Sequence, residues 1–127
     1  MRLRVFSAIA VLVSAAILML FVYHSFNEQI NNSIILQRYA QELKSTAEGG
    51  RLPVSFERAD WWGRQIVYVH SGDHFLIASF GRDGNPDMPD YSSLLHAQQG
   101  SKPSSNCLIP WRDTIFVDGN LYKGCLK

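Results

Sequence analysis

The feature that most constrains this chain is an uncharged apolar run at residues 5–23, which is long enough to cross a bilayer as one helix. At about 1.5 Å per residue, roughly 19 helical residues cover about 28 Å, close to the ~30 Å hydrocarbon thickness of a membrane. Two arginines lie within residues 1–4, and the next Lys or Arg is Arg38. The positive-inside rule therefore predicts a cytoplasmic segment 1–4, a transmembrane anchor and an exported segment 24–127.

A cleaved secretory signal peptide is the alternative interpretation, because a basic start followed by an apolar stretch serves both purposes. Its cleavage site needs small residues at the end of the apolar run. Small residues such as Ala8 and Ala10 lie inside the run instead, and the bulky Tyr23 stands at its end. No cysteine follows directly to take a lipid. The pattern therefore favours an uncleaved signal-anchor.

The exported segment has room for one small domain with a modest core. Two of the 12 Lys and Arg residues precede the anchor, whereas all 11 Asp and Glu residues follow it. With neutral histidines the exported part therefore carries about one negative charge. This balance gives no electrostatic footprint for nucleic acid or for an anionic membrane surface, so a nucleic-acid partner is not expected.

Both cysteines of the chain, Cys107 and Cys125, lie in the exported part. In an oxidising compartment such a pair is expected to form a disulfide bond, which would contribute roughly 3 kcal/mol by the chain-entropy estimate. Two unpaired thiols are the alternative. A metal-thiolate site is less favoured, because neither cysteine belongs to a Cys-x-x-Cys pair.

The exported part is predicted to begin as a helix over residues 26–48. Apolar residues recur there with the 3, 4 and 7 spacing of one helix face, namely at Leu36, Tyr39, Ala40, Leu43 and Ala47. Gly49 and Gly50 are the expected terminator, and Pro53 follows shortly afterwards. No Gly or Pro separates this helix from the anchor, so one continuous helix is predicted, with the polar stretch 24–33 as the place for fraying or a kink.

Two β-hairpins are predicted after the helix. Residues 65–80 contain two runs of β-branched and aromatic residues joined by a turn at 71–73. Residues 114–122 repeat this pattern around the turn pair Asp118-Gly119. We therefore expect an α+β fold in which a small antiparallel sheet of three or four strands packs on the long helix.

An acid-rich loop opens the segment between the hairpins, which is predicted to be a long ordered loop with a short helix near residues 91–98. Three carboxylates, of Asp83, Asp87 and Asp90, follow the preceding strand closely. With backbone carbonyls and water they could supply the roughly six to eight hard oxygens that Ca²⁺ prefers, although the spacing is not that of an EF-hand. The alternative is that these residues simply form turns, which their Asp-Gly, Asn-Pro and Pro-Asp pairs favour.

Two motifs flank the first hairpin, Ala59-Asp60-Trp61-Trp62-Gly63 at its start and Ser79-Phe80-Gly81-Arg82-Asp83-Gly84 at its end. Together they resemble the C-terminal domain of the major pseudopilin of type II secretion, a protein G-like family. That family has an Asp-Pro-Trp-Gly-like entry, a Tyr-x-Tyr-like strand and a Ser-x-Gly-x-Asp-Gly turn. The matching residues here are Asp60, Trp62, Gly63, Tyr68, Ser79, Gly81, Asp83 and Gly84.

The resemblance implies a pseudopilin-like fold and a calcium ion held by the loop. Asp83 corresponds by position to a family ligand, Ser79 belongs to the same motif, and Asp87 and Asp90 correspond by analogy to later acidic residues. The N-terminus departs from the family, whose members carry a leader ending in Gly and then a Glu at the fifth mature position. Residues 1–27 contain neither.

The two adjacent tryptophans are predicted to differ in burial. A tryptophan next to glycine at a strand entry usually packs into the core, so Trp62 is predicted to be buried. Trp61 would then point the other way and is the better candidate for a surface contact, because exposed tryptophans favour interfaces.

No nucleophile elbow, His-Glu-x-x-His pair or phosphate-binding glycine loop is present in the sequence. We therefore predict a non-enzymatic, single-pass protein of the bacterial inner membrane whose periplasmic domain binds envelope or secretion-system proteins. One alternative is a divergent pseudopilin that assembles into a secretion filament. Another is a small exported binding domain or hydrolase that uses His74 or the acidic loop.

Overall fold

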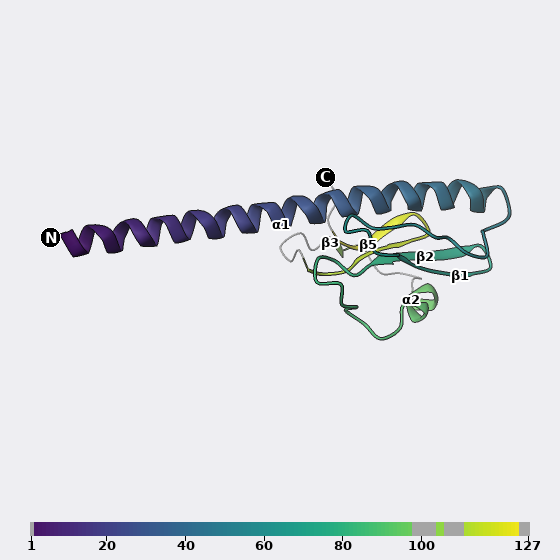
Figure 1. Ribbon diagram of the computed structural model, residues 1–127. Coiled ribbons are helices and arrows are strands. Elements are labelled where there is room, and N and C mark those ends of the chain that lie inside the picture. The colour runs from purple at the N-terminus through teal and green to yellow at the C-terminus, as the bar shows by residue number, and fades with distance from the viewer. Residues whose placement is uncertain (1, 98–103, 106–110, 125–127) are drawn as a thin grey trace.

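The computed structural model describes residues 2–97, 104–105 and 111–124 of the 127-residue chain. One long helix, α1, runs along a small domain and extends far beyond it at its N-terminal end (Figure 1). The rest of the described domain consists of a sheet, a short second helix and the loops that join them. This arrangement confirms the predicted α+β class and the long N-terminal helix.

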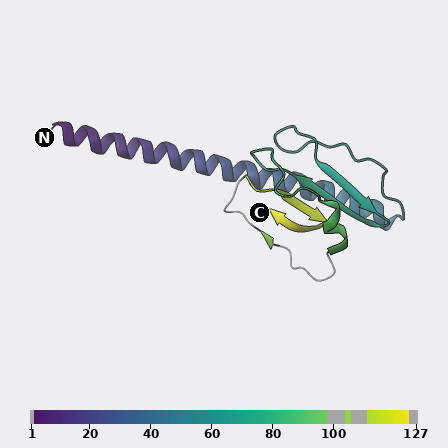
Figure 2. The ribbon, with the colours of Figure 1, turned by 90° about the horizontal axis from the view of Figure 1, so that it is seen from below.

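α1 spans Arg2–Glu48 without interruption and is close to straight in two perpendicular views (Figure 1, Figure 2). The sequence before Gly49 contains neither glycine nor proline, so no residue breaks the hydrogen-bond ladder. The helix ends as predicted: the Gly50 N–H donates to the Ala47 carbonyl at 2.9 Å, and Gly50 has a φ of 90°. The kink or fraying expected at residues 24–33 does not occur.

The sheet has five strands in the order β1-β2-β4-β5-β3. Their bounds are Val67–Ser71 (β1), His74–Ser79 (β2), Ser104–Ser105 (β3), Thr114–Val117 (β4) and Asn120–Gly124 (β5). β1, β2, β4 and β5 pair antiparallel, and the two-residue β3 pairs parallel to β5 at the edge. Both predicted hairpins are confirmed, and they join through β2 and β4, where Leu76 lies opposite Val117.

The turns follow the sequence signals closely. Asp118 and Gly119 join β4 to β5 with φ values of 50° and 81°, the left-handed pair that a tight hairpin requires. Gly72 joins β1 to β2 with a φ of 60°. The short helix predicted in the long loop is α2, which spans Ser92–Ala97.

The core has two layers because successive side chains of β2 point to opposite faces of the sheet. On one face Phe75 and Ile77 pack with Phe116 against the α1 residues Leu36, Ala40 and Leu43. On the other face Leu76 and Ala78 pack with Ile115, Val117, Tyr91 and Leu94. The sheet is thus covered by α1 on one side and by the α2 region on the other.

The N-terminal half of α1 has no such cover. Large apolar side chains stand exposed on all sides of it, among them Met19 at 74% exposure. In length and composition this helix is sufficient to cross a membrane, and none of its most apolar stretch is buried by the rest of the described chain.

Candidate functional site

The buried face of α1 becomes polar where the helix leaves the domain. Ser25, Gln29, Asn32 and Ser33 are all buried, and they continue the same stripe as Leu36 toward the N-terminus. We term the surrounding surface the helix-exit end; it comprises residues 60–64, 79–91 and 111–113 together with residues 21–33 of α1. Buried polar groups need hydrogen-bond partners, and here the loops at the end of the sheet supply them.

Two amides on α1 form these contacts. Gln29 Nε2 donates to the Arg112 carbonyl at 2.9 Å and to Thr114 Oγ1 at 3.1 Å. Asn32 Nδ2 donates to Ser79 Oγ at 3.0 Å, while Asn32 Oδ1 accepts from the Trp61 N–H at 3.1 Å. The two amides therefore bind partners outside the helix and do not compete for its own backbone hydrogen bonds.

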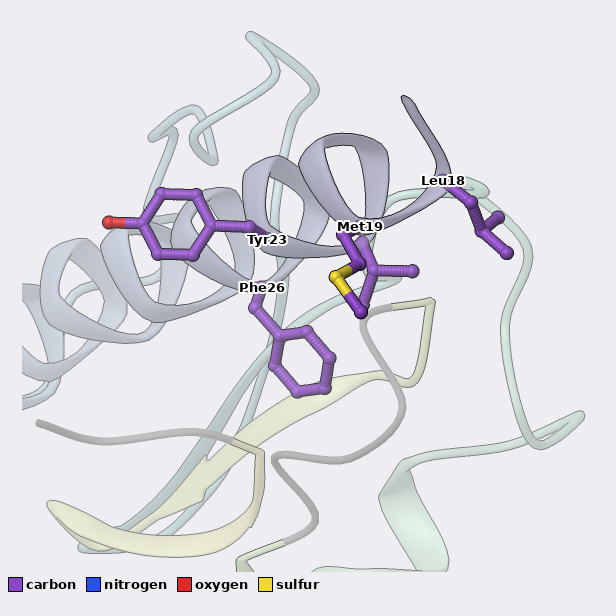
Figure 3. A pocket seen from close by; sticks show the side chains of 5 residues that line it. Leu18, Met19, Tyr23 and Phe26 are labelled. Atoms are coloured by element: carbon purple, nitrogen blue, oxygen red, sulfur yellow. The ribbon is translucent and has the colours of Figure 1, made fainter. Parts of the chain in front are cut away.

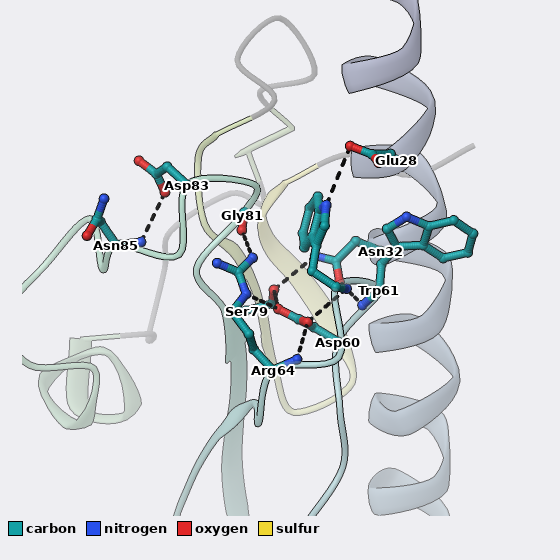
Figure 4. A network of polar contacts seen from close by, with 10 residues as sticks. Glu28, Asn32, Asp60, Trp61, Arg64, Ser79, Gly81, Asp83 and Asn85 are labelled. Atoms are coloured by element: carbon teal, nitrogen blue, oxygen red, sulfur yellow. Dashed lines mark hydrogen bonds and ion pairs between the residues drawn. The ribbon is translucent and has the colours of Figure 1, made fainter.

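Asp60 is the centre of this network (Figure 4). Its carboxylate, on a residue that is only 6% exposed, accepts from the backbone N–H groups of Trp62 at 3.0 Å and Arg64 at 2.9 Å. The other carboxylate oxygen accepts from Ser79 Oγ at 2.9 Å and lies 3.4 Å from Arg64 Nε. A buried carboxylate with this many donors is satisfied as an anion.

The network joins the two sequence motifs through Asp60 and Ser79, and it explains the glycines of the second motif. Arg64 Nη2 donates to the Gly81 carbonyl. A Cβ at Gly81, whose φ is 71°, would lie 2.5 Å from the Arg112 carbonyl oxygen, so only glycine fits there. A Cβ at Gly84 would collide with the Arg64 guanidinium. The motifs are therefore built for close packing of three loops.

Three of the four predicted calcium ligands have separate partners. Ser79 is buried in the Asp60 network. Asp83 is exposed, and its Oδ1 accepts from the Asn85 N–H at 3.1 Å (Figure 4). Asp90 accepts from the Ser92 N–H at 2.9 Å and from Ser92 Oγ at 2.7 Å, which caps α2. These hydrogen bonds lower the pKa of the Asp90 carboxyl group.

The fourth, Asp87, is paired with Asp113 through the backbone. The Asp87 N–H donates to Asp113 Oδ2 at 2.9 Å, and the Asp113 N–H donates to Asp87 Oδ2 at 3.0 Å. Arg112 Nη1 lies 3.5 Å from Asp87 Oδ1, and the Tyr91 hydroxyl donates to Asp113 Oδ2. Burial and the neighbouring Asp113 raise the pKa of Tyr91, so this hydroxyl remains a donor. We term these contacts the Asp87–Asp113 clamp.

The predicted ligands therefore do not form a shared coordination sphere in this arrangement. Within residues 2–97, 104–105 and 111–124, no group of three or more His, Cys, Asp or Glu side chains is placed to hold a metal ion. Calcium binding stays a prediction. Cys107 and Cys125 lie outside the described residues, so their disulfide also stays a prediction.

The tryptophans confirm one expectation and contradict the other. Trp61 is 45% exposed, as predicted. Trp62 is not part of the core: it is half-buried, with Nε1 donating to Glu28 Oε2 at 3.5 Å and its ring beneath the Arg64 guanidinium. The prediction was wrong because the Asp60 turn holds Trp62 in the loop before β1, where its indole meets Glu28 in the polar part of α1.

Arg82 forms a contact that sequence reasoning missed. Its guanidinium lies 4.7 Å from the ring centroid of Phe21, 3.6 Å from Glu28 Oε2, and donates to Ser25 Oγ. A loop that follows β2 is thus attached to the last turns of the apolar run. The polar residues that continue the Leu36 stripe were a sequence signal for loop contacts at this level, but nothing in the sequence identified Arg82 as a partner.

At the opposite end of the domain, His74 is paired with Asp118. His74 Nδ1 lies 2.8 Å from Asp118 Oδ2, while Asp118 Oδ1 accepts from the Phe75 N–H at 2.9 Å. The Asp118 carboxylate raises the pKa of His74. This pair ties the two hairpin turns together.

Comparison with known proteins adds no relative: no protein-family model matches the chain, and neither the curated proteins nor the solved structures include a significant match.

Proposed function

We propose that this protein is a non-enzymatic, single-pass membrane protein whose α+β domain stands on the periplasmic side of a bacterial inner membrane. Its work there is structural: it presents an interaction surface to envelope or secretion-system proteins. The observation that carries the proposal is α1, a single uninterrupted helix whose N-terminal half is apolar and bare and whose C-terminal half packs on the sheet.

The bare half of α1 requires a cover. Leaving its apolar side chains in water would cost on the order of tens of kcal/mol, more than the whole stability of a small domain. Lipid is the simplest cover for a helix that is apolar on every side, and the arginines before it orient the domain outward. The pseudopilin resemblance supports the same arrangement.

A structural role is supported by the state of the polar groups. The carboxylates of Asp60, Asp87 and Asp90 each hold loop backbone or a helix start, which is the use expected of a scaffold. The continuous helix also fixes the domain to its anchor without a flexible linker.

The proposal is tested by the location, mass and topology of the full chain in bacterial cells. We expect it to remain in the membrane after carbonate extraction, at its uncleaved mass, and a C-terminal alkaline phosphatase fusion to be active. A soluble product that has lost the apolar run would overturn the proposal. Crosslinking in native membranes would then identify the partner proteins.

The filament subunit is the second candidate, favoured by an apolar helix that is bare on all sides and could equally pack among copies of itself. Co-expression with a prepilin peptidase distinguishes the two. A shortened, polymerising product would establish the filament, whereas an unchanged mass without filaments supports the anchored scaffold.

A further inference from the structure

The helix-exit end gathers every tryptophan of the chain. The sequence has three, Trp61, Trp62 and Trp111. The Trp61 N–H is bound to Asn32 of α1 and the Trp62 indole to Glu28. Trp111 immediately precedes Arg112, whose carbonyl accepts from Gln29, and is 56% exposed. Trp61 and Trp62 therefore contact one short section of α1, and Trp111 is next in sequence to a residue that contacts the same section.

We propose that the helix-exit end of the domain lies in the lipid headgroup layer, with Trp61 and Trp111 as interfacial anchors. The domain is then docked on the bilayer instead of standing above it on a free helix. This inference rests on the proposed function, because it requires α1 to be inserted in a membrane. Tryptophan favours this layer, since its ring is apolar and its N–H needs a polar partner.

On an upright α1 these residues begin at the outer edge of the headgroup layer, and Asn32, which binds the Trp61 N–H, lies about 13.5 Å past Tyr23. Beyond the ~30 Å hydrocarbon core, a headgroup layer adds about 5–7 Å on each side. Glu28 lies five residues past Tyr23, or about 7.5 Å along the helix. Trp62 is bound at that level, and Figure 4 places the Trp61 indole beside α1 between the levels of Glu28 and Asn32.

A tilt of α1 brings the residues farthest from the membrane closer to the lipid headgroups. Transmembrane helices tilt by about 20° on average. The domain lies to one side of α1, so a tilt toward that side lowers the helix-exit end onto the bilayer (Figure 1). The packing at Arg82 favours contact, because its guanidinium lies over Phe21, inside the apolar run. A cation held at this level is placed where lipid phosphates lie.

Apolar surface continues from the anchor to this end of the domain. A groove beside α1 is lined by Leu18, Met19, Val22, Tyr23 and Phe26 (Figure 3). Phe26 is half-buried, so the apolar surface passes the end of the predicted span and reaches the domain. Among the described residues, the groove at the opposite end of the domain has a more polar lining, which includes Lys44, Glu48, Asp73, His74 and Asp118 beside Ala47 and Phe75.

The docking is expected to depend little on lipid charge. Arg82 is balanced by Glu28, and Arg112 by Asp87. Aromatic and apolar contact, which salt does not screen, therefore supplies the attraction. Zwitterionic lipid should be sufficient.

The experiment uses the full chain in nanodiscs of zwitterionic lipid that contain a fraction of lipid with a fluorescence quencher near the headgroup. The wild-type tryptophans should be quenched strongly, and added salt should change this little. Variants that keep only Trp61 or only Trp111, made by Trp→Phe substitution, should be quenched like the wild type. The matched control combines Trp→Phe at all three positions with Asn120→Trp at the opposite end, and should be quenched several-fold less.

Outcomes separate this inference from the proposed function. Carbonate extraction and quenching of a lipid-facing Met19→Trp probe in the tryptophan-free chain report insertion of α1. If α1 is inserted but the native tryptophans are quenched no more than the Asn120→Trp control, the docking is overturned. The docking is also overturned if, in native membranes, the tryptophans are covered by a crosslinked protein and not by lipid. If α1 fails to insert, the proposed function fails first. The wild-type measurement needs no substitution and so does not depend on variant folding.

Discussion

Asp60 shows how a single buried carboxylate defines a loop. Its two oxygens accept hydrogen bonds from two backbone N–H groups and one hydroxyl and pair with the Arg64 guanidinium, and all these groups come from the two sequence motifs or from Arg64 directly after the first. Ser79 extends the network to Asn32 on α1. The motifs resemble a family signature, and in this fold their physical role is to fix loops to each other and to α1.

Asp60→Asn should destabilise the domain by about 2–4 kcal/mol, because it leaves Arg64 without its carboxylate and breaks charge-assisted bonds. Chemical unfolding of the full chain in detergent micelles, followed by circular dichroism, measures the change. Asp83→Asn is the matched control, since that carboxylate is exposed, and it should change stability by no more than about 0.5 kcal/mol. Equal losses for both variants would contradict the central role of Asp60.

His74 should make stability depend on pH. The Asp118 carboxylate raises the pKa of His74 above 6.5 in the folded protein. The contribution of the His74–Asp118 pair to the free energy of unfolding is therefore fully present below the unfolded pKa of about 6.5. It is lost as pH rises through the folded pKa of His74. NMR titration of the His74 ring should give a raised pKa, and Asp118→Asn should lower it. An unchanged His74 pKa in that variant would rule out the pair.

At the scale of elements, α1 has three functional sections along one helix. The first is apolar on all sides, the second buries amides against loops, and the third buries Leu36, Ala40 and Leu43 against the sheet. The middle section differs from an ordinary amphipathic helix, because the partner surface there consists of backbone carbonyls and hydroxyls instead of apolar side chains.

Gln29→Ala should therefore cost about 1–3 kcal/mol, because it removes the donor to the Arg112 carbonyl and Thr114 and leaves a void. Gln37→Ala on the exposed face of the same helix is the control, and it should be neutral or slightly stabilising, since alanine is the better helix former. Thermal unfolding of the two variants compares them directly. Similar melting temperatures would show that the Gln29 contacts contribute nothing.

The loop between the hairpins is held by the Asp87–Asp113 clamp, so we expect its stability to come from protein contacts. Asp113→Asn should lower the melting temperature, at a cost of about 1–3 kcal/mol for the broken bonds to Tyr91 and the Asp87 N–H. Melting the wild type in chelator and in calcium tests the calcium prediction: equal melting temperatures would show that protein contacts alone hold the loop. A rise with calcium that chelator reverses would instead support the predicted ion site and a rearranged loop.

The sequence predicted those parts of the fold that depend on local patterns. The helix length, both hairpins and the Asp118-Gly119 turn follow from periodicity and turn chemistry within a few residues. The sequence did not predict the pairing of β2 with β4 or the parallel edge strand β3, because strands that are distant in sequence leave no local signal of their pairing. The position of the Trp62 side chain also depends on a partner that is distant in sequence, Glu28, so it was not predicted correctly.

At the scale of the whole molecule, the predicted disulfide would close the C-terminal part of the chain on itself. Cys107 and Cys125 bracket β4 and β5, so a bond between them would restrict the unfolded chain by roughly 3 kcal/mol. Mass spectrometry of the exported protein should show a gain of one hydrogen per cysteine on reduction. A protein isolated from oxidising conditions with both thiols free would contradict the bond.

The uninterrupted α1 also has a mechanical consequence. From Tyr23 to Glu48 the helix measures roughly 38 Å, and the sheet is fixed along most of that length. A change of about 10° in the angle of the membrane segment would therefore displace the far end of the domain by roughly 7 Å. If α1 is inserted as proposed, its uninterrupted course would make the domain a rigid lever that converts movements of the anchor into movements of a surface well outside the bilayer.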